Sequence, residues 1–368
     1  MKHVASLDGL RGVAVLLVVS FHYFPRGLAG PLSTVTSVGW MGVDVFFTLS
    51  GYLITSILYE QRSERQYLRN FYMRRVLRLF PLYYSVFLLA LALTSLLHIQ
   101  WRAGHIAFLL YGANLVLPVD GRLNWLGPFS LAHLWSLAVE EQFYLIWPWL
   151  VGSLLRKETL RRICVVGIVA APLLRLALLH AGVGPWWIYQ SLPTRMDSLL
   201  MGALLALERL PSLQVARTGG AVALLVFALV AWDGHSAFFL ARPMQGIGYS
   251  AAACVAASIL VLSLNPSTLS HRICSWRVMR FYGRYSYGIY LWHFLFLKQF
   301  GALTNWVERQ VTSPLFAGLL GFALILLCST VVAMVSYRWI ERPFLRAKLL
   351  FQSRHEVLVR TRRGETWM

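Results

Sequence analysis

The sequence predicts an all-α protein, a polytopic membrane helix bundle of about ten transmembrane helices with both termini in the cytoplasm. Composition is the first reason, because 58% of the 368 residues are hydrophobic and only 13% are charged. Soluble domains carry about 25% charged residues. The second reason is the recurrence of apolar segments long enough to cross a bilayer. The third is that Lys and Arg gather in alternate loops, as they do in polytopic membrane proteins.

The apolar segments form ten stretches of about spanning length. We place them near residues 7–24, 40–60, 79–98, 134–154, 163–180, 192–208, 218–232, 245–264, 285–300 and 315–338. A further apolar stretch, residues 105–117, is shorter than a usual span. Counting it as a span would break the alternation of basic loops. We therefore expect 105–117 to be re-entrant or interfacial.

The basic residues of the chain, which has a net charge of +19, set the predicted topology. They concentrate in loops 61–78, 155–162 and 270–284 and after residue 338. The intervening loops hold one basic residue or none: 25–39, 181–191, 233–244 and 301–314. Basic loops stay in the cytoplasm and meet anionic lipids, so we expect membrane lipids as partners and no nucleic acid. Residues 1–345 then form one membrane domain, and residues 346–368 form a basic cytoplasmic tail.

The four cysteines give no sign of a disulfide framework or a metal site. Cys164, Cys254, Cys274 and Cys328 are scattered and form no CxxC pair. Such residues act as small apolar side chains in a helix bundle. We expect no metal ion.

The first apolar segment carries three polar groups that a simple anchor does not need. Arg11 and His22 are 11 residues apart, close to three helical turns, so they share one face about 16 Å apart along the axis. Asp8 lies three residues before Arg11 and joins that face. Charged groups inside a membrane helix normally point into the bundle or a wet cavity. A signal peptide or plain anchor is the alternative, but no clean small-residue cleavage site follows.

Asp44 and Gly51 lie in the second apolar segment. Gly51 permits a close approach or a break of the helix, or serves packing alone.

The next segment opens on the basic cluster Arg74, Arg75 and Arg78. Guanidinium groups bind phosphate oxygens in pairs, so this cluster suits a phosphorylated ligand. Topogenic charge that meets lipid headgroups is the alternative.

Two adjacent carboxylates, Glu140 and Glu141, lie inside the fourth apolar segment. Neighbouring helix residues point about 100° apart, so only one of them faces a given cavity. His133, Ser136 and Glu140 follow i, i+3, i+7 spacing and therefore share a face. An intramembrane pair of carboxylates indicates a functional site more often than a structural one.

Three later polar residues stay open between a site and a structural role. Arg195 and Asp197 open a further segment, either as a local charge pair or as part of a site. His293 is a second histidine within an apolar segment, and a lone histidine there is often structural.

Six motifs, in order along nearly the whole chain, resemble the acyltransferase-3 family of integral membrane acyltransferases. They are Arg11 with His22 ten residues between, the Gly-Val-Asp block from Gly42 to Leu53, the Arg-Arg-x-x-Arg-x-x-Pro-x-Tyr block from Arg74 to Tyr83, the His-x-Trp-Ser-Leu block from His133 to Tyr144, Arg195 with Asp197 and Gly202, and the block from Ser286 to His293. The resemblance implies a stand-alone membrane domain in a bacterial plasma membrane.

The resemblance also implies an enzyme that moves an acyl group, often acetyl, from cytoplasmic acyl-coenzyme A to a hydroxyl of a carbohydrate or secondary metabolite. The acyl group then crosses the membrane, and no cofactor is bound permanently. Under this hypothesis His22 is the general base, Glu140 orients it, and Arg11 with the basic cluster holds the phosphates of coenzyme A. The alternative class is a transporter of acylated or lipid-linked sugars, which also needs buried charges.

Overall fold

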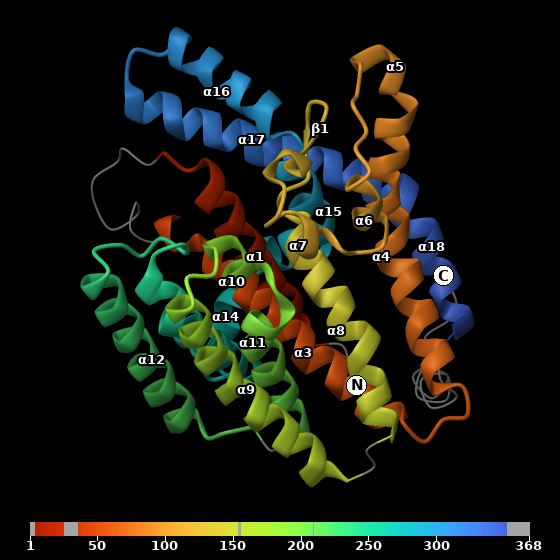
Figure 1. Cartoon of the computed structure of the whole chain (residues 1–368), viewed down its shortest axis with the longest axis vertical. Coiled ribbons are helices and arrows are strands. Elements are labelled where there is room, and N and C mark those ends of the chain that lie inside the picture. Colours follow the sequence, from red (N-terminus) through yellow and green to blue (C-terminus); the bar gives the residue numbers. More distant parts are fainter. Residues whose placement is uncertain (1–3, 26–35, 154–155, 209, 352–368) are drawn as a thin grey trace.

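The computed structural model describes residues 4–25, 36–153, 156–208 and 210–351, and these residues form a helix bundle (Figure 1). Each of the ten predicted apolar segments coincides largely with one helix. The long helices are α1 (Ala5–Tyr23), α3 (Gly42–Gln61), α4 (Tyr67–Ala92), α8 (Leu134–Ser153), α9 (Lys157–His180), α11 (Leu192–Leu207), α12 (Leu213–Asp233), α13 (Tyr249–Leu264), α15 (Arg277–Leu295) and α17 (Pro314–Ser336).

Shorter elements connect and extend these helices. They are η1 (Gly39–Met41), α5 (Thr94–Leu97), α6 (His105–Leu109), α7 (Ala113–Val116), η2 (Gly121–Asn124), β1 (Trp125–Leu126), β2 (Phe129–Ser130), α10 (Pro185–Gln190), η3 (Met244–Gly248), α14 (Leu269–Ser275), α16 (Leu297–Gln310), η4 (Tyr337–Glu341), α18 (Arg342–Ala347) and η5 (Lys348–Phe351). The two strands pair antiparallel as a small hairpin. Of the predicted tail, residues 352–368 lie outside the described residues.

Within the described part of the chain, seven helical segments are long and apolar enough to cross a membrane. They are Ala5–Tyr23, Gly39–Gln61, Tyr67–Ala92, Lys157–His180, Leu213–Asp233, Met244–Leu264 and Pro314–Ala347. Three other long helices do not meet this criterion of length and apolar character. Helix α11 has only 16 residues, and α8 and α15 carry several polar groups. The count of about ten spans and the cytoplasmic termini stay predictions.

Glycines allow the central helices to approach closely. A Cβ on Gly51 of α3 would lie 1.9 Å from the carbonyl oxygen of Leu199, and one on Gly202 of α11 would lie 1.9 Å from that of Thr48. Small residues at such contacts let two backbones pack without side chains between them, which is how many membrane helices associate. Of the alternatives that the sequence left open at Gly51, the structure shows the close approach of two helices. A similar contact joins α1 and α15, where Gly283 meets the backbone of Asp8.

The stretch 105–117 does not form a spanning helix. It contains only α6 and α7, of five and four residues, which at 1.5 Å per residue are far too short to cross a bilayer. Tyr111, between them, stacks on Tyr83 of α4 with 4.2 Å between ring centroids. Asn114 and Gln142 of α8 exchange amide hydrogen bonds of 3.1 and 2.8 Å. These contacts hold the segment against the bundle, and α6 and α7 lie near the middle of Figure 1, close to α4 and α8.

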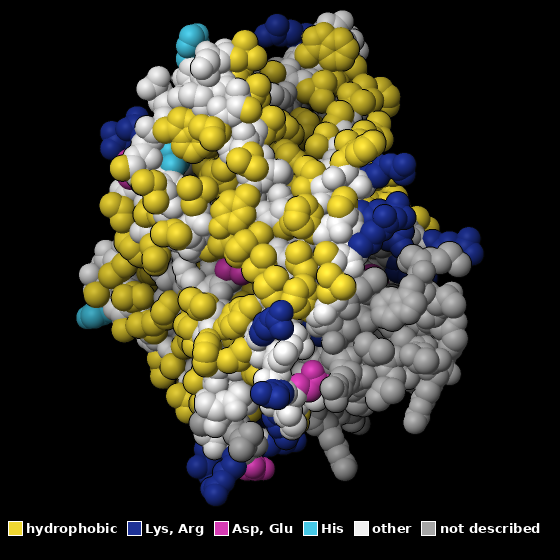
Figure 2. Space-filling view, turned by 90° about the vertical axis from the view of Figure 1, so that its right-hand side faces the viewer, with side chains coloured by type: hydrophobic (Ala, Val, Ile, Leu, Met, Phe, Trp, Pro, Cys, Tyr) yellow, Lys and Arg dark blue, Asp and Glu magenta, His cyan; other side chains and the backbone are white. Residues whose placement is uncertain are grey.

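Apolar side chains cover much of the outer surface (Figure 2). On α12 alone the exposed ones include Val222, Leu225, Leu229 and Trp232. Such a surface suits the hydrocarbon region of a bilayer, where helices satisfy their own backbone groups. Polar side chains such as Asp44, Arg195 and His293 are buried inside the bundle instead.

Candidate active site

Two cavities lie one beyond the other inside the bundle. The cavity that we call inner measures about 100 Å³ and is lined by residues of α1, α3, α4, α8 and α15, with Arg11, Arg75, Arg78 and Glu140 as its charged groups. The outer cavity measures about 290 Å³ and is lined by His22, His133 and a set of aromatic residues that includes Trp40, Trp135, Trp186, Tyr189, Phe239 and Phe294.

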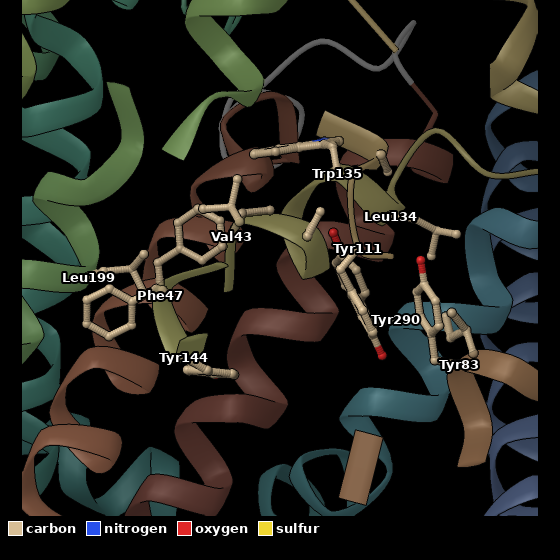
Figure 3. Close-up of a cluster of buried hydrophobic side chains, with 14 of the residues drawn as sticks. Val43, Phe47, Tyr83, Tyr111, Leu134, Trp135, Tyr144, Leu199 and Tyr290 are labelled. Carbon is tan, nitrogen blue, oxygen red and sulfur yellow. The ribbon is translucent and has the colours of Figure 1, made fainter. Parts of the chain in front are cut away.

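Val43 of α3 and Tyr290 of α15 line both cavities and so mark the boundary between them. The Tyr290 hydroxyl lies 2.5 Å from the Ser136 hydroxyl of α8. In Figure 3, Trp135 of the outer cavity lies on one side of Val43, and Tyr144 of the inner cavity lies on the other. The Tyr290 side chain therefore lies where the two cavities adjoin.

The inner cavity carries more positive than negative charge, because three arginines and one carboxylate line it. Arg11 forms a salt bridge of 2.9 Å with Asp8, one turn earlier on α1. Arg75 lies 4.9 Å above the centre of the Tyr144 ring, and the Tyr144 hydroxyl is hydrogen-bonded to Ser50. Aromatic faces attract guanidinium groups, so this contact helps to hold Arg75 in place.

The basic cluster predicted from the sequence divides between two environments. Arg75 and Arg78 line the inner cavity, whereas Arg74 is buried elsewhere and donates a hydrogen bond to Gln61 of α3. Adjacent residues on a helix point about 100° apart, which separates Arg74 from Arg75. The third arginine of the cavity is Arg11, from a different helix.

Three histidines lie close together, and two of them, His22 and His133, line the outer cavity. His22 Nδ1 of α1 lies 3.1 Å from His293 Nε2 of α15. His133, the residue before α8, has its ring centroid 5.9 Å from that of His293. His133 is 5% exposed, and neither of its ring nitrogens has a hydrogen-bond partner within the described residues. A buried polar group without a partner is costly, which indicates that His133 is placed to meet a ligand or water.

The face predicted for His133, Ser136 and Glu140 exists, but it extends along both cavities. His133 lines the outer one, and Ser136 and Glu140 line the inner one. His22 Nδ1 faces His293 and not the predicted Glu140, which lines the inner cavity two turns of α8 beyond His133. Glu141 lines neither cavity.

Asp44, Arg195 and Asp197 belong to buried charge pairs away from the cavities. Arg195 Nη2 donates to Asp44 Oδ1 over 2.8 Å, and Arg175 Nη1 donates to Asp197 Oδ2 over 2.9 Å. Arg195 and Asp197 thus do not form a local pair, because residues two apart on a helix point in different directions. Sequence reasoning missed Arg175, although a lone arginine within an apolar segment was a signal that it has a buried partner.

Long apolar helices around buried arginines and histidines define a polytopic membrane protein with an internal site. The chain belongs to the acyltransferase family whose model, described as "Acyltransferase domain", matches residues 4–338. The family resemblance inferred from the six motifs is therefore confirmed. The transporter alternative receives no support.

Two similar proteins carry more specific names. The peptidoglycan O-acetyltransferase OatA of Listeria monocytogenes is 32% identical over 368 residues, which cover 93% of this chain and 56% of that protein. The O-acetyltransferase OatA of Staphylococcus aureus (strain NCTC 8325) is 28% identical over 372 residues, 93% of this chain and 57% of that protein. This chain thus spans little more than half the length of these relatives. No solved structure matches it.

Proposed function

We propose that this protein is a membrane O-acyltransferase that moves an acetyl group from acetyl-coenzyme A to a hydroxyl of a carbohydrate across a bacterial plasma membrane. One observation carries the proposal, namely two cavities in line, with arginines at one and histidines at the other. Arg11 and His22 belong to one continuous helix, so about 16 Å separates them along the axis. An extended thioester arm that enters at Arg11 reaches towards His22 over this distance.

The donor end is assigned to the inner cavity. Its volume of about 100 Å³ admits a slender arm and not a nucleotide, so the nucleotide stays at the mouth. Arg11, Arg75 and Arg78 supply guanidinium groups whose paired N–H donors match phosphate oxygens. Glu140 lines the same cavity and offsets part of this positive charge when no donor is present.

The acceptor end is assigned to the outer cavity. Its volume of about 290 Å³ is at the small end of the range for ligand pockets, which suits one or two sugar rings. Trp135 and Trp186 give broad apolar faces with a polar N–H at the edge, which suits a ligand that has both C–H and hydroxyl groups. The name of the Listeria monocytogenes relative supports a peptidoglycan sugar as the acceptor.

The reaction needs a base for the hydroxyl proton and a donor for the developing oxyanion. His22 takes the proton while the acceptor oxygen bonds to the acetyl carbon. The carbon–sulfur bond then breaks, and the proton passes from His22 to the leaving thiolate. His133 lines the outer cavity, and its ring nitrogens form no side-chain hydrogen bond within the described residues, so a small rotation of its ring would let it donate to the oxyanion or to a second sugar hydroxyl.

Binding of acetyl-coenzyme A to purified protein in detergent tests the donor site. A double variant, Arg75→Gln with Arg78→Gln, removes two charge-assisted contacts worth about 1.5–3 kcal/mol each, so we expect binding to weaken at least about 100-fold. Arg69→Gln on the same helix is the control, because Arg69 is exposed, lines neither cavity and donates a hydrogen bond to Gln66.

The variant Arg74→Gln tests whether the third arginine of the predicted cluster contributes to binding of acetyl-coenzyme A. Arg74 is hydrogen-bonded to Gln61 and does not line the inner cavity, so we expect its replacement to leave binding within about threefold of the intact chain. Equal loss in the Arg69 and Arg75/Arg78 variants, or no binding to the intact chain, would refute the donor site.

A further inference from the structure

The His22 and His293 rings form a two-ring hydrogen-bonded unit. His22 Nδ1 lies 3.1 Å from His293 Nε2, and the two ring centroids are 5.2 Å apart. On its other side, His293 Nδ1 lies 2.7 Å from the carbonyl oxygen of Tyr290 and 3.1 Å from that of Ile289. The backbone carbonyl of His293 itself accepts a hydrogen bond of 2.6 Å from Tyr23, the residue after His22.

The carbonyl contacts determine where the protons lie. A carbonyl oxygen only accepts hydrogen bonds, so His293 Nδ1 must carry a hydrogen. In the neutral ring, His293 Nε2 then carries a lone pair and accepts. His22 Nδ1, which faces it, must be the donor. The lone pair of a neutral His22 is consequently on Nε2.

We propose that His293 is a positioning residue, which holds His22 as the tautomer whose Nε2 accepts the proton of the acceptor hydroxyl. This inference rests on the proposed function, in which His22 is the base. When His22 Nε2 takes the proton, its Nδ1–H stays bonded to His293 Nε2, which stabilises the imidazolium. The proton then passes from Nε2 to the thiolate of coenzyme A, and the pair returns to its starting state.

The hydrogen-bond acceptor for His22 Nδ1–H is a neutral imidazole, that of His293, and not a carboxylate. His293 is fully buried, and the rings that surround it within the described chain are those of His22, His133, Tyr23, Tyr290 and Phe294. No carboxylate is among these neighbours, whereas an aspartate fills the equivalent position in the serine protease triad. In a low-dielectric site, a neutral acceptor orients the base without the cost of burying another charge.

Two substitutions separate the hydrogen bond from packing. His293→Gln places an amide oxygen near the position of Nε2 and keeps an acceptor for His22. His293→Leu removes the acceptor and keeps most of the volume. Turnover is measured as coenzyme A released from acetyl-coenzyme A by the full chain in liposomes, with solubilised peptidoglycan fragments as the acceptor.

We expect His293→Leu to lower kcat about 10- to 100-fold with KM for acetyl-coenzyme A within about twofold, since a general base contributes about 10²- to 10⁴-fold. His293→Gln should recover most of the lost kcat. His22→Ala should abolish turnover. His180→Gln is the control, because His180 is exposed at the end of α9. Equal kcat in His293→Leu and the intact chain would overturn the proposal.

The tautomer itself provides a readout that does not need activity. Long-range ¹⁵N–¹H correlation spectra of histidine-labelled protein, at about pH 8, distinguish a protonated ring nitrogen from an unprotonated one. The His22 signals are identified by their loss in His22→Ala. We expect His22 to carry its hydrogen on Nδ1 in the intact chain and in His293→Gln, and to shift towards the other tautomer in His293→Leu.

The two readouts separate the possible failures. An intact chain without turnover that still shows the expected tautomers counts against the proposed function and supports the pairing of the two rings. A hydrogen on His22 Nε2 in the intact chain, or an unchanged tautomer in His293→Leu, refutes the positioning role even where turnover is normal.

Discussion

Replacement of Asp197 by alanine is expected to destabilise the bundle without touching either cavity. Asp197 and Arg175 are both fully buried. The Asp197 carboxylate accepts from Arg175 Nη1 over 2.9 Å, from the Ser250 hydroxyl over 2.7 Å and from the Ser198 backbone N–H over 3.1 Å. These bonds join α9, α11 and α13, so the substitution leaves a buried guanidinium without its counter-charge.

The magnitude follows from the burial of the pair. Removal of one partner of a buried salt bridge costs about 3–5 kcal/mol, because the remaining charge stays desolvated. Arg175 would keep its bonds to the carbonyl oxygens of Thr194 and Gly246, over 2.6 and 3.1 Å, and these satisfy part of its hydrogen-bonding capacity. We therefore expect Asp197→Ala to lower the free energy of unfolding by about 3 kcal/mol, towards the lower end of that range.

The assay is a double-mutant cycle on the free energy of unfolding, measured by titration with sodium dodecyl sulfate in mixed micelles. The variants are Asp197→Ala, Arg175→Met and both together. Removal of both charges leaves no unpaired buried charge. The double variant should therefore lose about 1–3 kcal/mol less unfolding free energy than the sum of the losses in the two single variants. Additive effects, or a loss below about 1 kcal/mol in Asp197→Ala, would refute the reasoning. Acetyl-coenzyme A binding per folded molecule should stay unchanged.

Two further predictions concern packing and the boundary between the cavities. Gly202→Leu should cost at least about 1–3 kcal/mol of unfolding free energy, because its Cβ would meet the α3 backbone at 1.9 Å. Gly219→Ala is the matched control, since a Cβ there meets nothing within 4 Å, and a small gain in stability is expected instead. Tyr290→Phe removes the 2.5 Å hydrogen bond to the facing serine hydroxyl and should cost about 1 kcal/mol in the same titration. Unaltered stability in Gly202→Leu or Tyr290→Phe would contradict these assignments.

Local patterns in the sequence predicted a large part of the fold. The ten apolar segments coincide with helices because helix length and hydrophobicity are properties of contiguous residues. The alignment of Arg11 with His22 and the shared face of His133, Ser136 and Glu140 followed from helix geometry alone. Stretch 105–117 was separated from the spans by its length and by the charge of the flanking loops.

Such local patterns could not predict which side chains of different helices meet. The rotation of each helix about its axis decides which side chains meet, and that rotation depends on how all the neighbouring helices pack together. Arg74 therefore turns to Gln61 while Arg75 faces the inner cavity. His22 contacts His293 across 271 positions of sequence, where sequence reasoning assigned Glu140.

The sequence by itself determined the class of protein, the helices, and the placement of basic and titratable groups along each helix, because these depend on residues close together in the chain. Only the tertiary structure decided that the polar groups form two cavities that meet at Tyr290, and that the charges of Arg175 and Arg195 have buried partners. A buried charge is stable only beside a partner, and the partner of each of these arginines lies on another helix.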